Sequence, residues 1–264
     1  MRNSQSIGVF DSGVGGTSIW KEIIKALPNE NTIYLADIAN APYGEKSAEK
    51  IIELSIKNTE KLINLDCKII VVACNTATTN AIEILREKYK IPIIGIEPAI
   101  KPAALASKSK AIGILATKGT LSSALFHKTS SLYASDLKVI EVVGKGLVEL
   151  IEADKIESEE MHKLLEEYLQ PMISQNIDYL VLGCSHYPYL IPVLRTILPK
   201  NVTIIDSGQA VALQTKNILI KNNLLNANND AVNHLLFSNA STTVLRKLTH
   251  SEKDKDLSVE YLEF

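Results

Sequence analysis

The chain has 264 residues, of which 46% are hydrophobic, with a mean hydropathy of +0.08 and a formal net charge of −2. This length and composition supply enough apolar side chains for one large or two ordinary domains, which excludes a disordered chain. The small net charge offers no basic surface for nucleic acid or an anionic membrane, and no run of about 18 apolar residues predicts a membrane span. We therefore expect a cytoplasmic protein with a small-molecule partner, binding neither nucleic acid nor membrane.

Three cysteines, Cys67, Cys74 and Cys184, form neither an even disulfide set nor a CxxC or HExxH ligand pattern. Free thiols in a reducing compartment are the simplest interpretation, so neither a disulfide-stapled fold nor a structural metal site is expected. Cys67 precedes a strand-like segment and is expected to be an ordinary buried residue. The other two cysteines each follow a hydrophobic strand and precede a polar turn, which makes them candidates for chemistry.

Short β-branched runs alternate with longer segments of helical periodicity. Helical spacing of apolar residues predicts helices at 46–65 and 158–173. This alternation is typical of α/β proteins, in which helices cover parallel sheets. Strands are expected at 7–10, 32–36, 68–73, 91–96, 111–116, 138–143, 179–182 and 202–205.

The last part of the chain is less regular. A helix is expected at 209–222, with Asp206 or Ser207 as its cap, followed by a strand at 234–237. The charged segment 251–256 is expected to form a solvated helix, which the hydrophobic Leu257, Val259 and Leu262 would dock. This tail is expected to fold back on the first half of the chain.

An internal repeat divides the chain. Ile7–Gly13 matches Ile112–Lys118 at an offset of 105, and Cys74 matches Cys184 at an offset of 110. The segments 94–97 and 204–207 match at the same offset of 110. A period of this length is that of a domain, so two similar α/β halves are expected, at about 7–97 and 112–207. The predicted domains are residues 1–97 with 208–264, and residues 98–207.

A glycine-rich turn follows the first strand, in the sequence Asp11-Ser12-Gly13-Val14-Gly15-Gly16-Thr17. Ligands of parallel sheets bind at the carboxyl ends of strands, where this turn lies. Its glycines permit positive φ and close approach, and its N–H groups can meet an anion at a helix start. The turn has neither the lysine of a P-loop nor GxGxxG spacing, which favours a carboxylate over a nucleotide phosphate.

Cys74 and Cys184 stand at equivalent positions of the repeat, each where a strand ends. A thiolate at a helix N-terminus is stabilised by the helix dipole, so we expect the pKa of these thiols to be lowered from about 8.5 toward neutrality. Two thiols offered from two related halves can face each other across one substrate. Opposed acid/base groups suit the removal of a proton from one face of a carbon and its return on the other, which inverts a stereocentre.

Neighbouring polar residues leave several roles open. His186 is either the proton partner of Cys184 or a structural histidine. Asp11 either caps the glycine-rich helix or pairs with the thiol of Cys74. Tyr43 serves packing or the site, and Glu97 either touches the site or lies outside it.

The chain resembles bacterial glutamate racemases. The resemblance covers about residues 7–220 and rests on five motifs in the family's order: 10–16 (FDSGVGG), 42–44 (PYG), 73–77 (ACNTA), 95–99 (GIEPA) and 183–188 (GCSHYP). It implies two α/β domains related by a pseudo-twofold axis, with the active site between them. It also implies a cofactor-independent isomerase that interconverts L- and D-glutamate and supplies D-glutamate for peptidoglycan, and thus for cell-wall biogenesis and cell shape. A homodimer is compatible with the resemblance, but the sequence does not give the oligomeric state.

Carried over motif by motif, Cys74 and Cys184 are the two acid/base catalysts, assisted by Asp11 and His186 respectively. Glu152 corresponds least securely to a family glutamate near the second thiol, because the preceding segment 143–147 lacks the family's pattern. The family usually has threonine at Ser185, and serine keeps the hydroxyl. The residues that the resemblance places on the substrate are Asp11, Ser12, Tyr43, Gly44, Asn75, Thr76, Thr117, Ser185 and His186.

Rival functions remain at this point. An aspartate or hydantoin racemase would share the two-thiol mechanism and differ in the size of its pocket. A related decarboxylase would need only one thiol. A Cys-His hydrolase would use Cys184 as nucleophile and His186 as base, and would leave Cys74 and the repeat unexplained. A non-catalytic amino-acid binder is the remaining alternative.

Overall fold

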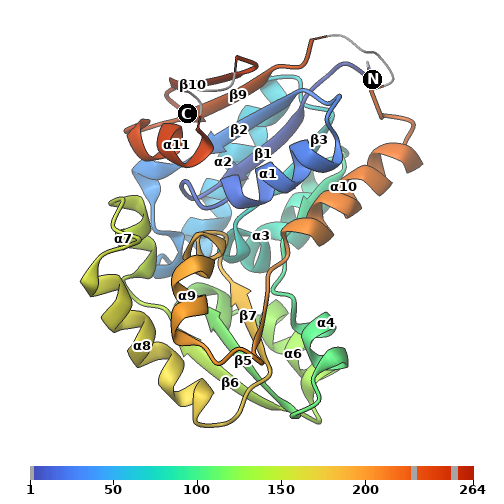
Figure 1. Ribbon diagram of the computed structural model, residues 1–264. Coiled ribbons are helices and arrows are strands. Elements are labelled where there is room, and N and C mark those ends of the chain that lie inside the picture. The colour runs from blue at the N-terminus through green and yellow to red at the C-terminus, as the bar shows by residue number, and fades with distance from the viewer. Residues whose placement is uncertain (1–2, 227–230, 251–254) are drawn as a thin grey trace.

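The computed structural model describes residues 3–226, 231–250 and 255–264, which form two parallel β-sheets flanked by helices (Figure 1). The larger sheet has the strand order β10-β9-β2-β1-β3-β4, and the smaller sheet has the order β6-β5-β7-β8. The larger sheet consists of β1 (Ile7–Asp11), β2 (Thr32–Ala36), β3 (Ile69–Val72), β4 (Ile93–Gly95), β9 (His234–Ser238) and β10 (Leu257–Tyr261). The smaller sheet consists of β5 (Ala111–Ala116), β6 (Lys138–Val143), β7 (Tyr179–Gly183) and β8 (Thr203–Ile205).

Pairs of helices pack around each sheet (Figure 1). On the larger sheet, α1 (Thr17–Ala26) packs against α10 (Gly208–Lys221), and α2 (Ala48–Asn64) packs against α3 (Asn75–Lys88). On the smaller sheet, α8 (Glu159–Ile173) packs against α9 (Ile191–Ile197), and α4 (Ile100–Ala106) packs against α6 (Ala124–Ala134). The short elements are α5 (Lys118–Leu121), α7 (Leu147–Glu152), α11 (Thr243–Thr249), η1 (Ile38–Asn40), η2 (Tyr43–Glu45) and η3 (Tyr187–Leu190).

The helical layers account for the apolar strand sequences. Every residue of β3 is fully buried, as expected for a central parallel strand that is covered on both faces. The edge strand β6 alternates between exposed and half-buried residues instead. In the described part of the chain, no helix has the length and apolar character needed to cross a membrane.

The repeat predicted from the sequence is confirmed by the strand order. The run β2-β1-β3-β4 of the larger sheet corresponds to β6-β5-β7-β8 of the smaller sheet. The register between the two central strands repeats as well, because Ile7 lies opposite Ile69 and the equivalent Ile112 lies opposite Tyr179. The division into domains at residues 97 and 207 stays a prediction.

The strands and helices expected between residues 7 and 222, and the strand at 234–237, are confirmed with small differences at their ends. The helix expected at the C-terminus is wrong after residue 254, because Leu257–Tyr261 forms β10, which pairs with β9. Leu257 and Val259 are buried and alternate with more exposed residues, which is the period of two of a strand. Residues 251–254 of that prediction lie outside the described residues.

A buried ion pair holds the amino-terminal edge of the larger sheet together, at the end opposite the thiols. Lys68 Nζ lies 2.5 Å from Glu30 Oε2, and the two side chains are only 0% and 2% exposed. Lys68 also donates to the carbonyl oxygen of Asn3 at 2.5 Å, and Glu30 Oε1 accepts from the backbone N–H of Asn226 at 2.7 Å. The pair therefore joins four segments that are far apart in the sequence.

Replacing Lys68 with methionine is expected to lower the free energy of unfolding by about 3–5 kcal/mol, because the Glu30 carboxylate is left buried without its cation. Equilibrium unfolding in urea measures the loss. The double variant Lys68→Met/Glu30→Gln, which removes both charges, is expected to regain more than half of it. A single variant as stable as the wild type would contradict this assignment.

Candidate active site

The two thiols open into one cavity at the carboxyl ends of the central strands. Cys74 lies two residues after β3, and Cys184 directly follows β7. The cavity volume is about 20 Å³, which is the space of about one water molecule. Its walls come from both halves of the chain and consist of Ser12, Pro42, Tyr43, Gly44, Cys74, Asn75, Thr76, Thr117, Val148, Cys184, Ser185 and His186.

Cys74 is the N-cap of α3 and is buried, with 4% of its surface exposed. Its sulfur accepts from the backbone N–H of Ala77 at 3.4 Å and donates to Ser12 Oγ at 3.6 Å. Burial raises the pKa of Cys74 strongly, and the charges of Asp11 and Cys184 raise it further, against the lowering effect of the Ala77 N–H. The expectation of a lowered pKa is therefore wrong for Cys74: the helix N-terminus is present, but burial outweighs it.

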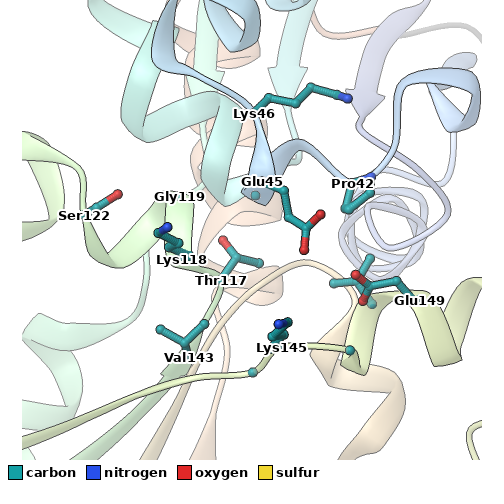
Figure 2. A pocket seen from close by; sticks show the side chains of 14 residues that line it. Pro42, Glu45, Lys46, Thr117, Lys118, Gly119, Ser122, Val143, Lys145 and Glu149 are labelled. Carbon is teal, nitrogen blue, oxygen red and sulfur yellow. The ribbon is translucent and has the colours of Figure 1, made fainter.

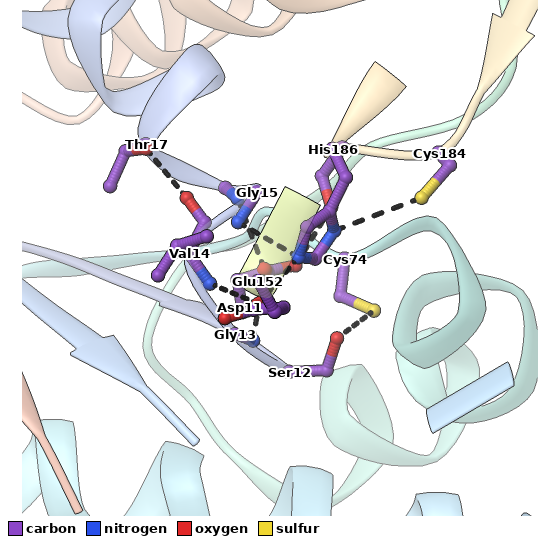
Figure 3. A network of polar contacts seen from close by, with 12 residues as sticks. Asp11, Ser12, Gly13, Val14, Gly15, Thr17, Cys74, Glu152, Cys184 and His186 are labelled. Carbon is purple, nitrogen blue, oxygen red and sulfur yellow. Dashed lines mark hydrogen bonds and ion pairs between the residues drawn. The ribbon is translucent and has the colours of Figure 1, made fainter. Parts of the chain in front are cut away.

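Cys184 belongs to a chain of polar contacts with His186 and Glu152 (Figure 3). His186 Nδ1 lies 3.8 Å from Cys184 Sγ, and His186 Nε2 lies 2.7 Å from Glu152 Oε1. Burial alone would lower the pKa of His186, but the bonds to Cys184 and Glu152 outweigh it and raise that pKa well above its ordinary value. Cys184 thus lies beside an imidazole that is backed by a carboxylate, whereas Cys74 lies beside a serine hydroxyl and a backbone N–H, so the two thiols of the cavity have different polar surroundings.

The glycine-rich loop binds the chain's own carboxylates. The N–H groups of Gly13 and Gly16 donate to Asp11 Oδ2 at 3.1 and 3.0 Å, and the N–H of Val14 donates to Glu152 Oε1 at 2.9 Å. The N–H of Gly15 lies 3.2 Å from His186 Nε2, the nitrogen that donates to Glu152 when the imidazole is protonated. The expectation that this loop holds a carboxylate of a ligand is therefore wrong in this structure, because the N–H groups of Gly13, Val14 and Gly16 already bind the chain's own carboxylates.

The glycines of this loop are required for close approach. A Cβ atom on Gly13 would lie 2.0 Å from Glu152 Oε1, and one on Gly15 would lie 2.1 Å from His186 Nδ1. Neither glycine has a positive φ, so that part of the expectation is wrong. Both contacts join the loop after β1 to residues of the other half of the chain.

Asp11 is fully buried behind the cavity and does not line it. Its Oδ1 accepts from Ser185 Oγ at 2.9 Å, across the two halves. Burial raises the pKa of Asp11, while His186 and the surrounding donors oppose the rise. Of the two roles expected from the sequence, Asp11 caps the glycine-rich loop, and its hydrogen bonds go to that loop and Ser185 instead of the Cys74 thiol.

Two groups of polar side chains at the cavity wall are available to a ligand: the amide of Asn75 and a cluster of threonine hydroxyls. Within the described part of the chain, neither amide atom of the buried Asn75 has a hydrogen-bond partner. Thr76 Oγ1 and Thr117 Oγ1 lie 2.9 Å apart, and Thr120 Oγ1 lies 3.3 and 3.0 Å from them. Neither Thr120 nor Val148 of the wall was predicted from the sequence. The signal that could have identified Thr120 is the capping spacing Thr117-x-x-Thr120 at the start of α5.

Of the remaining candidates, Tyr43 lines the cavity, whereas Glu97 and Cys67 do not. The hydroxyl of Tyr43 donates to Asp37 and accepts from Asn58. Glu97 is exposed and does not line the cavity. Cys67 is buried, and burial raises its pKa to about 12, as expected of an ordinary structural thiol.

A larger pocket of about 450 Å³ adjoins the cavity and shares Pro42, Gly44, Thr117 and Val148 with it. Figure 2 shows its two sides, one formed by the 42–46 segment of the first half and the other by residues after β5 and β6 of the second half. The pocket and the cavity therefore lie next to each other between the two halves of the chain. The described residues include no group of three or more His, Cys, Asp or Glu side chains arranged to hold a metal ion.

Fold and site together define an α/β protein of two repeated parallel sheets, with one thiol from each half in a shared cavity, which is the arrangement that two-base inversion of a carbon centre requires. The sequence model of the Asp/Glu/hydantoin racemase family matches residues 7–215. The chain belongs to this family.

Similar proteins extend the match to nearly the whole chain. A glutamate racemase of Ectopseudomonas mendocina is 48% identical over 227 residues, covering 85% of this chain and 86% of that protein. Crystal structures of glutamate racemases from Bacillus anthracis and Escherichia coli superpose with TM-scores of 0.87 and 0.85 at 31% and 32% identity. They cover 100% and 98% of this chain and 99% and 98% of their own chains, and the Escherichia coli protein was crystallised with L-glutamate.

We expect the imidazole of His186 to remain protonated at pH 7, because its bonds to Cys184 and Glu152 raise its pKa. NMR titration of the histidine ring resonances, assigned with a His186→Gln variant, measures the midpoint. A midpoint at or below about 6.5 would contradict the assignment. Glu152→Gln removes one of the two raising contacts and is expected to lower the midpoint.

The same shift predicts a dependence of stability on pH. Because the folded pKa of His186 exceeds the unfolded value of about 6.5, its contribution is complete below that pH and is lost as the pH rises through the folded pKa. The difference in unfolding free energy between the wild type and His186→Gln is therefore expected to shrink above pH 6.5 or so. Urea unfolding at a series of pH values tests this, and a difference that grows with pH would refute it.

Proposed function

We propose that this protein is a cofactor-independent glutamate racemase in which Cys74 and Cys184 act as the two acid/base groups. The observation that carries the proposal is the pair of thiols in one buried cavity, one from each repeated half. Curated relatives named glutamate racemase at 45–48% identity, over 85–92% of the chain, support glutamate as the substrate.

The reaction moves one proton off the α-carbon and another onto it. The thiolate of one cysteine removes the α-proton and becomes a thiol, while the carbon retains the electron pair. The thiol of the other cysteine then donates its proton to the opposite face and becomes a thiolate. The pair ends in the reverse protonation state, which is the state required for the opposite enantiomer.

The surroundings of the two thiols suit different steps of the reaction. Burial and the Asp11 charge raise the pKa of Cys74, which keeps that sulfur protonated as the acid. The His186 ring, held by Glu152, lies 3.8 Å from Cys184 Sγ, where it can exchange a proton with that sulfur. The two directions of a symmetric reaction are therefore served by bases with different neighbours.

The wall supplies donors for the charges of an amino acid. The unpartnered amide of Asn75 and the hydroxyl groups of Thr76 and Thr117 are available to a bound carboxylate. Ser185 Oγ donates its proton to Asp11, so its oxygen is left to accept a hydrogen bond from the ammonium group of the substrate. Fixed donors in a cavity closed to water stabilise the developing carbanion, which an isolated thiolate in water would not produce at a useful rate.

The volume of the cavity requires a motion. A space of about 20 Å³ holds a water molecule but not an amino acid. We therefore assign the structure to a closed state, and the two halves have to separate along the adjoining pocket for substrate entry. The halves that move are the domains 1–97 with 208–264, and 98–207.

The proposed setting follows from the proposed activity. A racemase that forms D-glutamate in the cytoplasm supplies peptidoglycan synthesis, and hence cell-wall biogenesis and cell shape. The expected partner is the small-molecule substrate, and a homodimer stays a prediction. Aspartate and hydantoin racemisation would use the same two thiols, but the relatives at 45–48% identity are named glutamate racemase, which favours glutamate. A hydrolase or an amino-acid binder leaves the second buried thiol without a role.

Incubation with L-glutamate without added cofactor in deuterated water tests the activity. Optical rotation is expected to decay to zero while deuterium enters the α-position. Parallel incubations with L-aspartate and a hydantoin serve as controls for the substrate, and are expected to show less than about 1% of that rate, because their charges or lengths do not match the spacing of the donors. No loss of rotation with L-glutamate would overturn the proposal.

Cys74→Ser and Cys184→Ser are each expected to abolish racemisation, by about 10³-fold or more in kcat/KM, because a hydroxyl is a much weaker acid than a thiol. Cys67→Ser is the matched control, since that thiol is buried away from the cavity, and full activity is expected of it. Full activity of either Cys74→Ser or Cys184→Ser would refute the two-thiol mechanism.

A further inference from the structure

The larger sheet contains a segment that the repeat does not explain. Strands β9 and β10 have no counterpart in the smaller sheet, and they follow the part of the chain that the racemase family model matches, which ends at residue 215. β9 pairs with β2 along its whole length, from the partners Thr32 and His234 to the partners Ala36 and Ser238. The residue after this last pair is Asn239, at the carboxyl end of the sheet where the thiols also lie.

The side chain of Asn239 forms two hydrogen bonds with the segment that follows β2. Its Nδ2 donates to Asp37 Oδ1 at 2.6 Å, and its Oδ1 accepts from the backbone N–H of Ala39 at 2.9 Å. Both ends of the amide are thus used, on two residues of the short segment that leads to the cavity wall. An amide that satisfies a carboxylate and an N–H together fixes the segment more firmly than either bond alone.

Asp37 is the centre of this arrangement and is only 1% exposed. An ionised carboxylate only accepts hydrogen bonds, and this one receives them from four side chains. Besides Asn239, the donors are Asn40 at 2.7 Å, Asn58 at 3.4 Å and the hydroxyl of Tyr43. The donors come from the tail, from η1, from α2 and from the cavity wall, so the carboxylate sets the position of each relative to the others.

Tyr43 connects Asp37 to the wall of the cavity. The residue is 1% exposed and lines the cavity that both thiols line, while its hydroxyl donates to Asp37 and accepts from Asn58 Nδ2 at 3.0 Å. The next residue, Gly44, is packed so closely against the other half that a Cβ atom there would lie 3.0 Å from Thr117 Cβ. A shift of Tyr43 therefore changes the fit between the two halves at the mouth of the cavity.

We propose that Asn239 is a positioning residue of the active site, acting through Asp37 on the wall formed by Tyr43 and Gly44. The C-terminal strands thus serve the site as well as the edge of the sheet. The kinetic test of this inference rests on the proposed racemase activity, whereas the rate of alkylation of the cavity thiols tests it independently of that activity.

Two variants of Asn239 distinguish the loss of its hydrogen bonds from the addition of a negative charge beside Asp37. Asn239→Ala removes both amide contacts and is expected to lower kcat/KM for glutamate by about tenfold, the scale of a lost hydrogen bond to a charged group. Asn239→Asp keeps the shape and the acceptor for Ala39 but places a second carboxylate against Asp37. Repulsion between the two is expected to make its loss larger than that of Asn239→Ala.

Asn31 provides a matched control at the other end of the same pair of strands. Its Nδ2 donates to the carbonyl oxygen of Ser4 at 3.1 Å, and its Oδ1 accepts from the N–H of Asn233 at 2.8 Å. Asn31→Ala therefore also removes two amide contacts, one of them to the tail, but far from the cavity. It is expected to lower the urea midpoint about as much as Asn239→Ala and to leave kcat/KM within about twofold of the wild type.

A double-mutant cycle with Tyr43→Phe tests the route. If Asn239 acts through Asp37 and the Tyr43 hydroxyl, Asn239→Ala adds less than about twofold in kcat/KM to the Tyr43→Phe variant. An unchanged tenfold loss in that background would overturn the route. A loss in Asn239→Ala no greater than that in Asn31→Ala would overturn the positioning role itself.

Alkylation of the cavity thiols gives the readout that needs no activity. With iodoacetamide at fixed pH, Cys74 and Cys184 are expected to react several times faster in Asn239→Ala than in the wild type, because the wall that closes the cavity is displaced, and no faster in Asn31→Ala. A wild type inactive on glutamate would overturn the proposed function alone. Equal alkylation rates in wild type and Asn239→Ala would overturn the positioning role alone.

Discussion

The glycine-rich loop after β1 meets Glu152, Ser185 and His186 of the other half at hydrogen-bonding distance, and the rest of the site depends on this contact. Backbone N–H groups of the loop hold the Asp11 and Glu152 carboxylates. Those carboxylates in turn orient Ser185 and His186. Only residues without a Cβ fit at Gly13 and Gly15, so the loop sets how closely the halves can approach. The same approach reduces the cavity between the thiols to the size of a water molecule.

Closure of that cavity makes the two thiols unequal. Each sulfur follows a central strand of one repeated sheet, but Cys74 is the N-cap of α3, whereas Cys184 precedes the turn that leads to η3. The neighbouring side chains differ as well: Cys74 has a serine hydroxyl and a buried carboxylate nearby, whereas Cys184 has an imidazole backed by a glutamate. A reaction that needs one acid and one base is served by this difference, because one sulfur keeps its proton while the other lies beside an imidazole that can exchange a proton with it.

Much of this fold was predictable from sequence, because β-branched runs and helical spacing are local signals. The match of residues around Cys74 and Cys184 at one offset also predicted the equivalent strands that carry them. The direction of the Cys74 pKa was not predictable, since it depends on burial by residues far apart in the chain. The strand β10 was missed because its pattern is short and follows a charged segment, and its parallel pairing with β9 is a tertiary contact.

Contacts between residues that are distant in the sequence could not be predicted either. Glu152 was the least secure of the sequence candidates, yet it lies 2.7 Å from His186, which no local pattern indicates. One of the two roles expected of Asp11 was to pair with the Cys74 thiol, but its carboxylate hydrogen-bonds to the loop and to Ser185, and it acts on Cys74 only through its charge. The role of Asn239 depends on the pairing of β9 with β2, which the sequence alone does not specify.

The distribution of solvent deuterium between the two enantiomers during the first few per cent of turnover tests the two-thiol account most directly. Two opposed monoprotic groups return only the original hydrogen to the recovered substrate and place a solvent-derived one on the product. Starting from either enantiomer of glutamate, the account predicts deuterium in the product and none in the recovered substrate. Deuterium in the recovered substrate at the level of the product, or original hydrogen transferred to the product, would contradict it.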